Sequence, residues 1–270
     1  MSAGAPPPPE RRFPGFELLF AGLGSLVLLL VVAPLLGLFL TASLSGLSAA
    51  AADAEVLRSL RLTLGAALAA TLVCTLAGVP LAYLLARHRF PGRPVLLALV
   101  DLPVVIPHTA AGIALLTVIG RHSLLGRATG GLVGTSAGIA LAMAFVSTPY
   151  LLSAAREAFT AVPVRLEQVA RTLGASPARV FFTISLPLAG RGVLSGMILM
   201  WARGISEFGA VIIIAYYPMT TPVLIFQRFN DYGLPYARSV AQLLIAVCIV
   251  IFIVLRFVAR TRREGEDDHA

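Results

Sequence analysis

The chain has 270 residues, of which 58% are hydrophobic and only 13% are charged, and its mean hydropathy is +0.89. In a soluble domain about a quarter of the residues are charged, so this composition excludes a water-soluble protein and predicts that lipid surrounds most of the chain. The formal net charge is +8, and all 21 basic residues are arginines. They stand between long apolar runs instead of along one face, so nucleic acid is not expected as a partner.

Hydropathy divides the chain into tails and membrane spans. Residues 1–15 include Pro6 to Pro9 followed by Glu10, Arg11 and Arg12, and this composition predicts a disordered cytoplasmic tail. Six apolar stretches follow, each long enough for a helix of about 20 residues that crosses a bilayer. We therefore expect an all-α, polytopic membrane protein of about six transmembrane helices over 16–259, followed by a cytoplasmic tail over 260–270. The stretches are 16–42, 60–86, 95–119, 132–155, 190–214 and 238–259.

Arginine placement predicts the orientation of these spans. The connections on one side hold fourteen arginines and those on the other side hold six, so both termini are expected in the cytoplasm. The first stretch has a second interpretation, because Arg11 and Arg12 before an apolar run, with small residues at 48–52, also suit a cleaved secretory or twin-arginine signal. The run is longer than the usual 7–15 or so residues of a signal, which favours a permanent span.

The third stretch contains Asp101, Pro103, Pro107 and His108. Two prolines four residues apart predict a kink or a local unwinding of the helix. Such a break suits either plain packing or a bend that lines a pathway. His108 is expected to be hydrogen-bonded, since no histidine or cysteine stands at the spacing of a second metal ligand.

The fifth stretch carries two opposite charges, Arg203 and Glu207. Four residues apart on a helix, they share one face and can pair, which reduces the cost of charge inside a membrane. Two interpretations remain open: a structural ion pair, or a pair that lines a pathway or gate with Ser206, Phe208 and Gly209. Elsewhere Cys74 and Cys248 lie in apolar runs without metal spacing, so neither a metal site nor a bound cofactor is expected.

The connection over 156–187 is longer and more regular than the others. A helix interrupted at Pro163 is expected to end at Gly174 in the left-handed conformation. Ser176 and Pro177 then have the residue types of an N-cap and a first helical position. The new helix reaches about Ser185, places its apolar residues on one face, and is expected to break at Leu186–Pro187. The apolar residues of that face are Val180, Phe181 and Ile184.

This connection resembles the "EAA" loop of the permeases of ABC importers. The resemblance is carried by Glu167, Gln168, Ala170, Gly174, Ala175, Pro177, Leu186 and Pro187. The chain departs at the start of the motif, so either Glu167 is the acidic residue one place early or Gln168 replaces it. In the family the loop holds a coupling helix that docks on a cytoplasmic ATPase, and Phe181 and Phe182 suit such docking as aromatic anchors. The alternative is a helix that lies on the membrane surface.

A second resemblance concerns the segment from Trp201 to Ala210, which is similar to the R-x-x-x-E-F-G-A stretch of molybdate, tungstate and sulfate permeases. Residues 211–218 look most like the molybdate/tungstate members. The resemblance implies a type I ABC importer permease with the MetI-like fold, in a prokaryotic inner or plasma membrane. It also implies a homodimer with two ATPase subunits, an extracytoplasmic oxyanion-binding protein, and transport by alternating access.

Three other interpretations of the sequence stand beside a molybdate/tungstate permease. A sulfate or thiosulfate permease is the same class with another cargo. A secondary transporter needs no ATPase, but it would show internal repeats. A membrane enzyme needs convergent catalytic groups, and nothing in the spacing of Asp101, His108 and Glu207 brings them together. The chain has no lysine and hence no P-loop lysine, so we expect a partner to hydrolyse ATP and this chain not to be an enzyme.

Overall fold

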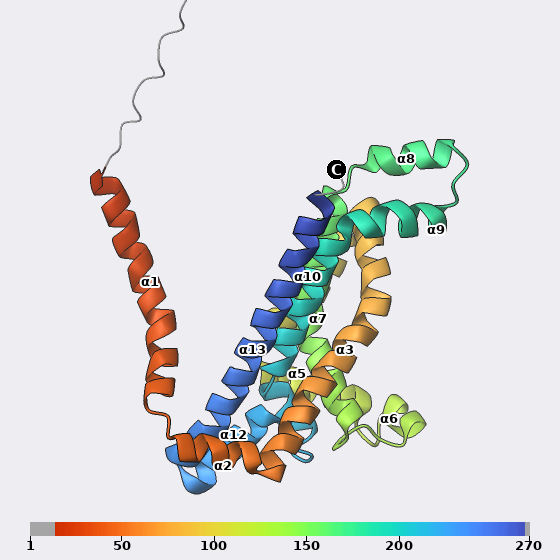
Figure 1. Cartoon of the computed structure of the whole chain (residues 1–270). Coiled ribbons are helices and arrows are strands. Elements are labelled where there is room, and N and C mark those ends of the chain that lie inside the picture. Colours follow the sequence, from red (N-terminus) through yellow and green to blue (C-terminus); the bar gives the residue numbers. More distant parts are fainter. Residues whose placement is uncertain (1–13, 268–270) are drawn as a thin grey trace, which may run out of the picture.

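The computed structural model describes residues 14–267, so most of the predicted first tail, and residues 268–270 of the second, lie outside the described residues. Every element of the described chain is helical (Figure 1). The elements are α1 Pro14–Leu40, α2 Leu44–Ala52, α3 Ala54–Arg87, α4 Arg93–Val105, α5 His108–Ile119, α6 Leu124–Thr129, α7 Ser136–Ala161, α8 Val164–Thr172, α9 Pro177–Val180, the π-helical turn η1 Phe181–Ser185, α10 Leu186–Ile205, α11 Gly209–Ile214, α12 Thr221–Tyr232 and α13 Leu234–Asp267.

Five stretches of helix in the described chain are long and apolar enough to cross a membrane: α1, α3, α7, α9 to α10, and α13. A sixth span is made only if α4 and α5 are counted together, and these two helices are bent by 117° at their junction. The all-α polytopic fold is therefore confirmed. The predicted kink or unwinding of the third stretch over 95–119 is confirmed, because Pro107 cannot donate to the helix ladder and the chain turns there.

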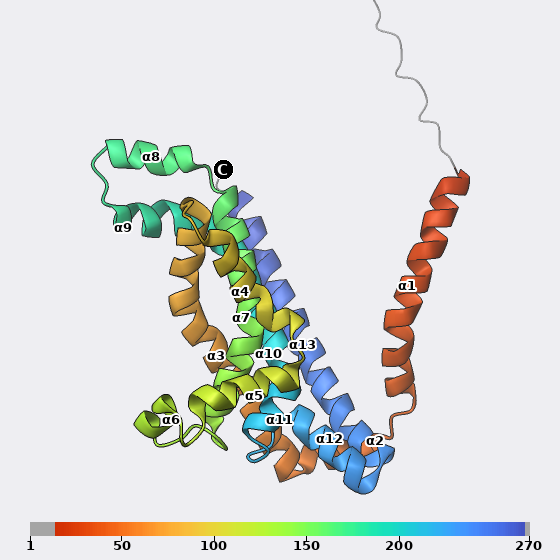
Figure 2. The same cartoon turned by 180° about the vertical axis from the view of Figure 1, so that it is seen from behind.

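The core of the bundle is α7, which packs along its length against α3 and α10 (Figure 1 and Figure 2). Its side chains Ile139, Met143 and Leu151 are fully buried. Small residues let the backbones approach: a Cβ placed on Gly196 of α10 would lie 3.0 Å from the Cβ of Ala154 and 3.2 Å from the carbonyl oxygen of Leu151. Close packing of small residues replaces the hydrophobic driving force that is absent between helices in lipid.

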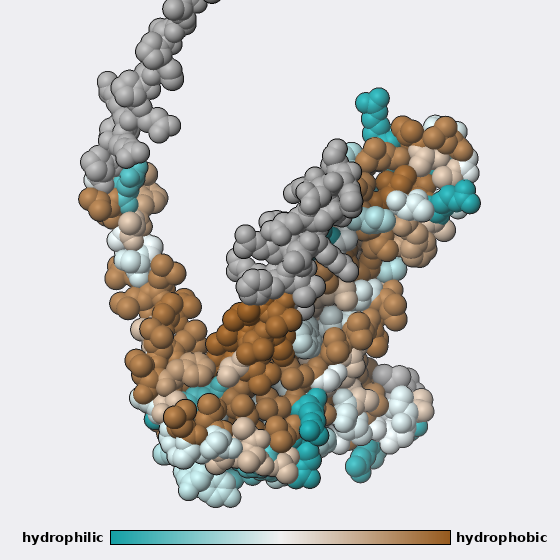
Figure 3. All heavy atoms as spheres, in the orientation of Figure 1, coloured by the Kyte–Doolittle hydropathy of each residue, from teal (hydrophilic) through white to brown (hydrophobic). Residues whose placement is uncertain are grey.

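The helix α1 stands apart from this bundle for most of its length (Figure 1 and Figure 2). Its side chains are apolar around the whole circumference and exposed, as is typical of a helix in lipid. Figure 3 shows apolar residues along α1 and on the neighbouring face of the bundle. Its C-terminal end is held, because Gln242 on α13 donates a 2.6 Å hydrogen bond to the carbonyl oxygen of Leu38.

Three short helices, α2, α6 and α12, lie at the end of the molecule opposite α8 and α9 (Figure 1). Hydropathy does not predict them, because they are short or of mixed polarity. An ion pair joins α12 to the start of α3: Arg228 lies 2.6 Å from Asp53 and 3.0 Å from Glu55. The hydrogen bond from Arg228 holds the pKa of Asp53 below its usual value.

Two further boundaries differ from the sequence-based expectation. The backbone of α13 stays helical to Asp267, which carries the helix of the last span into the tail expected over 260–270. Leu186–Pro187 does not break the helix that begins at Pro177, because the chain continues through η1 directly into α10. In this π turn the amide of Leu186 reaches the carbonyl oxygen of Phe181, and the widened backbone accommodates a proline that cannot donate.

We expect Gly196→Val to lower the free energy of unfolding by about 1–3 kcal/mol, the usual cost of overpacking, because the new side chain meets the backbone of α7. The matched control is Gly190→Val on the same helix, where a Cβ has no atom within 4 Å. Thermal unfolding in detergent measures both. Equal midpoints for the two variants would show that α7 and α10 do not pack as described.

Candidate functional site

The loop between α7 and α10 forms a hairpin of helices that projects from one end of the bundle (Figure 2). Gly174 ends α8 with a φ of +88°, as expected. The amide of Ala175 bonds the carbonyl of Ala170 and the amide of Gly174 bonds that of Arg171, both at 3.0 Å. This pair of bonds is the Schellman arrangement, in which glycine has no steric penalty.

The second helix of the hairpin also begins as expected. The hydroxyl of Ser176 accepts the amide of Arg179 at 3.3 Å, and Pro177 occupies the first turn. On the inner face Val180 is fully buried, and Phe181 and Ile184 are half-buried. The predicted apolar face is therefore confirmed.

A buried carboxylate, Glu167, fastens the hairpin to the bundle. It is 2% exposed, and its Oε1 accepts hydrogen bonds of 2.8 Å from Arg87 Nε and Ser185 Oγ. Its Oε2 accepts the hydroxyl of Tyr83 at 3.0 Å. Arg87 also donates to the carbonyl oxygen of Val162 at 3.1 Å. One side chain of α8 thus holds the C-terminal end of α3 and the π turn η1.

Burial alone would raise the pKa of Glu167, but the hydrogen bonds from Ser185, Arg87 and Tyr83 outweigh it and hold that pKa below its usual value. The carboxylate is therefore ionised at neutral pH and pairs with the arginine. Gln168, the other candidate for the acidic position of the motif, is exposed. Residue spacing does not predict that Tyr83, Arg87 and Ser185 bind Glu167, since two of the three lie about 80 residues away from it in the sequence.

The outer face of the hairpin is apolar and exposed. Leu166, Val169 and Leu173 of the α8 region are 45%, 50% and 83% exposed, and Phe182 is 65% exposed. Of the two predicted aromatic anchors only Phe182 faces outward. Phe181 packs inward instead, with ring centroids 5.0 Å from Tyr83 and 6.0 Å from Phe159, because the buried face of its helix rests on α3 and α7.

The second group of predicted residues lies where two spans are interrupted. One interruption is at Ile106–Pro107, between α4 and α5, and the other is at Ser206–Phe208, between α10 and α11. The two meet: a Cβ on Gly209 would lie 2.7 Å from the Cβ of His108. Of the two prolines, Pro103 is buried within α4, and Pro107 precedes α5 and is exposed. The expected unwinding is confirmed.

Charges converge at this junction. The predicted pair forms, with Arg203 Nη2 2.9 Å from Glu207 Oε2. His108 Nδ1 lies 3.0 Å from the same oxygen. Sequence spacing gave no reason to expect this contact, since the two residues are about a hundred positions apart. Glu207 is fully buried, and its Oε1 accepts the amide of Ala210 at 2.9 Å, which caps α11. The carboxylate thus fixes both interruptions.

The remaining predicted residues of this group differ in exposure. Ser206 is exposed, and its hydroxyl accepts a 3.2 Å hydrogen bond from Arg203. The ring of Phe208 lies 5.1 Å from that of Phe226 on α12. Arg203 and His108 are partly exposed, with side-chain exposures of 18% and 35%. A cationic and hydroxylic surface, from Arg203 and Ser206, therefore lies beside two aromatic rings that are tilted toward each other.

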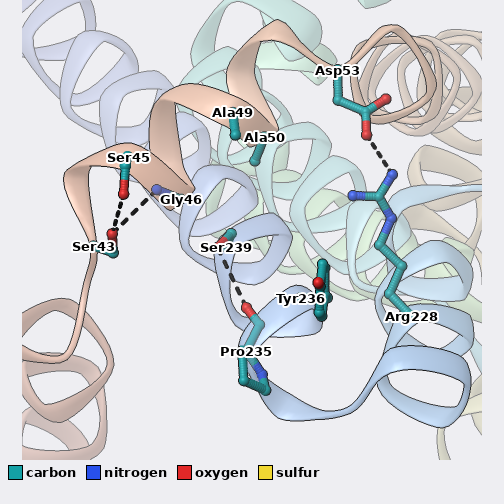
Figure 4. Close-up of a pocket in the computed structure, with 10 residues that line it drawn as sticks. All are labelled: Ser43, Ser45, Gly46, Ala49, Ala50, Asp53, Arg228, Pro235, Tyr236 and Ser239. Atoms are coloured by element: carbon teal, nitrogen blue, oxygen red, sulfur yellow. Dashed lines mark hydrogen bonds and ion pairs between the residues drawn. The ribbon is translucent and has the colours of Figure 1, made fainter.

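A pocket of about 420 Å³ lies at the opposite end of the molecule from the hairpin, between α2, α12 and the start of α13 (Figure 4). Its polar groups mostly bond one another: Ser43 and Ser45 lie 2.6 Å apart, and Arg228 holds Asp53. Ser239 bonds the backbone of Pro235. These bonds brace the end of the bundle and leave few free donors for a ligand.

Removal of the Glu167 charge tests how the hairpin is held. Glu167→Gln leaves Arg87 without a counter-ion. We therefore expect the free energy of unfolding to fall by roughly 3 kcal/mol, at the low end of the cost of breaking a buried ion pair. The pKa of Glu167 is lower in the folded protein than in the unfolded chain. The stabilisation that its charge gives to the wild-type protein is therefore complete above the unfolded pKa of about 4.3 and is lost as pH falls through the folded pKa.

Hydrogen exchange over 164–185 measures this effect. The amides should exchange faster in Glu167→Gln than in the matched control Gln168→Ala, whose side chain is exposed on the same helix. The pH dependence should be present in the control and absent from Glu167→Gln. Identical protection in both variants would contradict the role given to the carboxylate.

Comparisons with known proteins agree with these features. Residues 78–264 match the family described as binding-protein-dependent transport system inner membrane component. A molybdate/tungstate transport system permease protein, WtpB, of Thermococcus kodakarensis is 43% identical over 241 residues, which are 88% of this chain and 94% of that protein. A probable sulfate transport system permease protein of Chlorokybus atmophyticus is 31% identical over 216 residues, 77% of this chain and 76% of that protein.

The fold is also found among solved structures. The inward-facing MetNI methionine ABC transporter matches with a TM-score of 0.60 and 16% identity, over 77% of this chain and 98% of the matched one. The resemblance of the two motifs to ABC importer permeases, and to their molybdate/tungstate branch, is thus confirmed. The chain is a multi-pass membrane protein that belongs to the family of inner membrane components of binding-protein-dependent transport systems.

Proposed function

We propose that this chain is the transmembrane permease subunit of an ATP-driven importer of molybdate and tungstate. The observation that carries the proposal is the hairpin of α8 to η1, which presents an exposed apolar face while Glu167 ties it to the bundle. The substrate follows from relatives: the protein named for molybdate and tungstate is 43% identical, and the protein named for sulfate is 31% identical.

The hairpin is the docking surface for an ATPase subunit in this proposal. Exposed apolar side chains with one aromatic anchor are typical of a helix that enters a protein groove. Two copies of this chain, two ATPases and an external oxyanion-binding protein form the assembly. Both termini lie in the cytoplasm, and the positions of the first residues of α1 and the end of α13, at the same end as the hairpin, support this orientation (Figure 1).

Movement of the ATPases reaches the pathway through the bundle. Glu167 on α8 binds groups of α3 and of η1, and η1 continues into α10. A displacement of α8 therefore moves α3 and α10 as well. The far end of α10 is the interruption that carries Arg203 and Glu207. Alternating access requires two arrangements of these elements that substrate and ATP bind differently.

The junction of the two interruptions lines the pathway in this proposal. Its members are Pro103, Pro107, Arg203, Ser206, Glu207, Phe208 and Gly209. Ionisable residues at membrane depth typically mark a substrate path. Glu207 does not repel a passing dianion, because Arg203 pairs with its carboxylate. In this proposal the tilted rings of Phe208 and Phe226 form an apolar constriction of the kind that gates by excluding water.

The proposal is tested by the ATPase activity of the permease reconstituted with its ATPase and binding protein, titrated separately with molybdate, tungstate and sulfate. Stimulation by molybdate and tungstate alone is expected. Stimulation by sulfate instead would keep the importer and change its cargo. If no ATPase assembles on the reconstituted chain, the proposal is wrong.

Substitution of Gly174 tests the coupling turn. Gly174→Val forces a β-branched residue to a φ of +88°, at a strain of roughly 1–3 kcal/mol. We expect the hairpin to shift and ATP hydrolysis to continue with little transport. The control is Gly92→Val, which has the same φ of +88° and equally open space but lies in the turn before α4. Normal transport by Gly174→Val in proteoliposomes would falsify the coupling role of this turn.

A further inference from the structure

The helix α3 is tied to other elements at both of its ends, and the proposed function does not use the outer tie (Figure 1). At the inner end Arg87 binds Glu167 of the hairpin. At the outer end Arg228 on α12 pairs with Asp53, the N-cap of α3, and with Glu55. The 34 residues of α3 rise about 51 Å in a regular helix, so one element connects the hairpin to α12.

A second contact between α3 and α12 consists of hydroxyl groups. Ser59 and Thr63 on α3, with Thr220 and Thr221 at the start of α12, are each at most 1% exposed, and these four residues form the hydroxyl joint. The amide of Thr221 donates to Thr63 Oγ1 at 2.8 Å. Thr221 Oγ1 lies 3.2 Å from Thr63 Oγ1 and 3.3 Å from Ser59 Oγ. The hydroxyls of Ser59 and Thr63 donate to their own helix, so Thr221 is the donor between the helices.

Apolar side chains of both helices surround the hydroxyl joint. The buried residues beside it in the sequence belong to the main core of the bundle: Val56, Leu60, Val223 and Leu224. A hydroxyl that loses its partner in such a place leaves a costly unpaired group, because water does not replace the partner. The hydroxyl joint therefore favours discrete arrangements over a continuous slide.

Thr220 is the exception within the hydroxyl joint. Its side chain is fully buried, and its Oγ1 has no hydrogen-bond partner among the residues that the structure describes. It occupies the N-cap of α12 but makes no side-chain capping bond. A capping threonine normally accepts the amide of the second or third helical residue, and the second residue here is Pro222, which has no amide. An unpaired buried hydroxyl is rare and requires an explanation.

We propose that the hydroxyl joint is a two-position switch of the transport cycle. Thr221 binds Thr63 in the arrangement described here, and the hydroxyl of Thr220 takes its place on Thr63 in the other. Neighbouring Cα atoms are about 3.8 Å apart, so a shear movement of α12 along α3 by that distance exchanges them. The long side chain of Arg228 stays paired meanwhile, and Phe226 moves with its helix. The inference rests on the proposed function and adds to it the element through which α3 acts on the outer end of the pathway.

A disulfide across the hydroxyl joint tests whether it must move. Thr63→Cys with Thr221→Cys places two thiols where hydroxyl oxygens lie 3.2 Å apart, in a chain that also carries Cys74→Ala and Cys248→Ala. Mass spectrometry of the peptides measures the fraction that is cross-linked. We expect molybdate uptake by the reconstituted complex in proteoliposomes to be lost in proportion to that fraction and to return with dithiothreitol. Thr63→Cys alone is the matched control under the same oxidant. Normal uptake by the cross-linked complex would overturn the proposal.

A second comparison needs no cross-link. Thr220→Val keeps the shape of the side chain and removes the unpaired hydroxyl, so the unfolding midpoint of the full chain in detergent should not fall. Uptake should slow by about fivefold, the weight of one hydrogen bond in the other arrangement. The control Thr71→Val removes a buried hydroxyl of α3 that donates to its own helix, and its uptake should equal that of the wild type.

Two results of this comparison would overturn the proposal: a lower unfolding midpoint for Thr220→Val, or uptake equal to that of Thr71→Val. The wild-type complex separates the two levels of inference. If it takes up neither molybdate nor tungstate, the proposed function is wrong, whatever the variants show.

Discussion

Backbone polar groups have no water partner inside a bilayer, and each one left unsatisfied costs several kcal/mol. The interruptions of two spans in this chain therefore depend on protein that closes over them. They meet at one junction, where Glu207 caps α11, pairs with Arg203 and contacts His108. Glycines at the contact allow the two segments to approach within van der Waals distance. A junction fixed in this way can change only as a unit, which is the property that a gate between two discrete states requires.

The hairpin at the other end of the bundle depends on a similar arrangement. A buried carboxylate, Glu167, binds groups from α3 and from η1 and belongs to α8. The exposed apolar face of the hairpin and its anchored inner face lie on opposite sides of the same short helices. A partner that moves the outer face therefore moves the inner contacts as well. Since η1 continues directly into α10, the hairpin and the junction are two ends of one helical element.

Apolar exposure has little diagnostic value in a protein of this class, because lipid is as apolar as leucine. The helix α1 is exposed around its whole circumference, as a single helix in a bilayer is. Charged side chains within the membrane spans are more informative about function. The cluster at the junction, where Glu207 is fully buried beside Arg203, is a place where this chain accepts the cost of charge within a membrane span.

Local patterns in the sequence determined the helical class, the limits of most spans, the turn at Gly174, the helix start at Ser176–Pro177, the pair Arg203–Glu207 and the break near Pro107. Each depends on hydropathy or on residues a few positions apart, which fix local geometry. Tertiary structure alone decided that Glu167 and not Gln168 is buried, that Phe181 turns inward, that His108 meets Glu207, and that the third span bends by 117°. These outcomes depend on contacts between distant segments. Their positions follow from packing of the whole bundle, which no local pattern records.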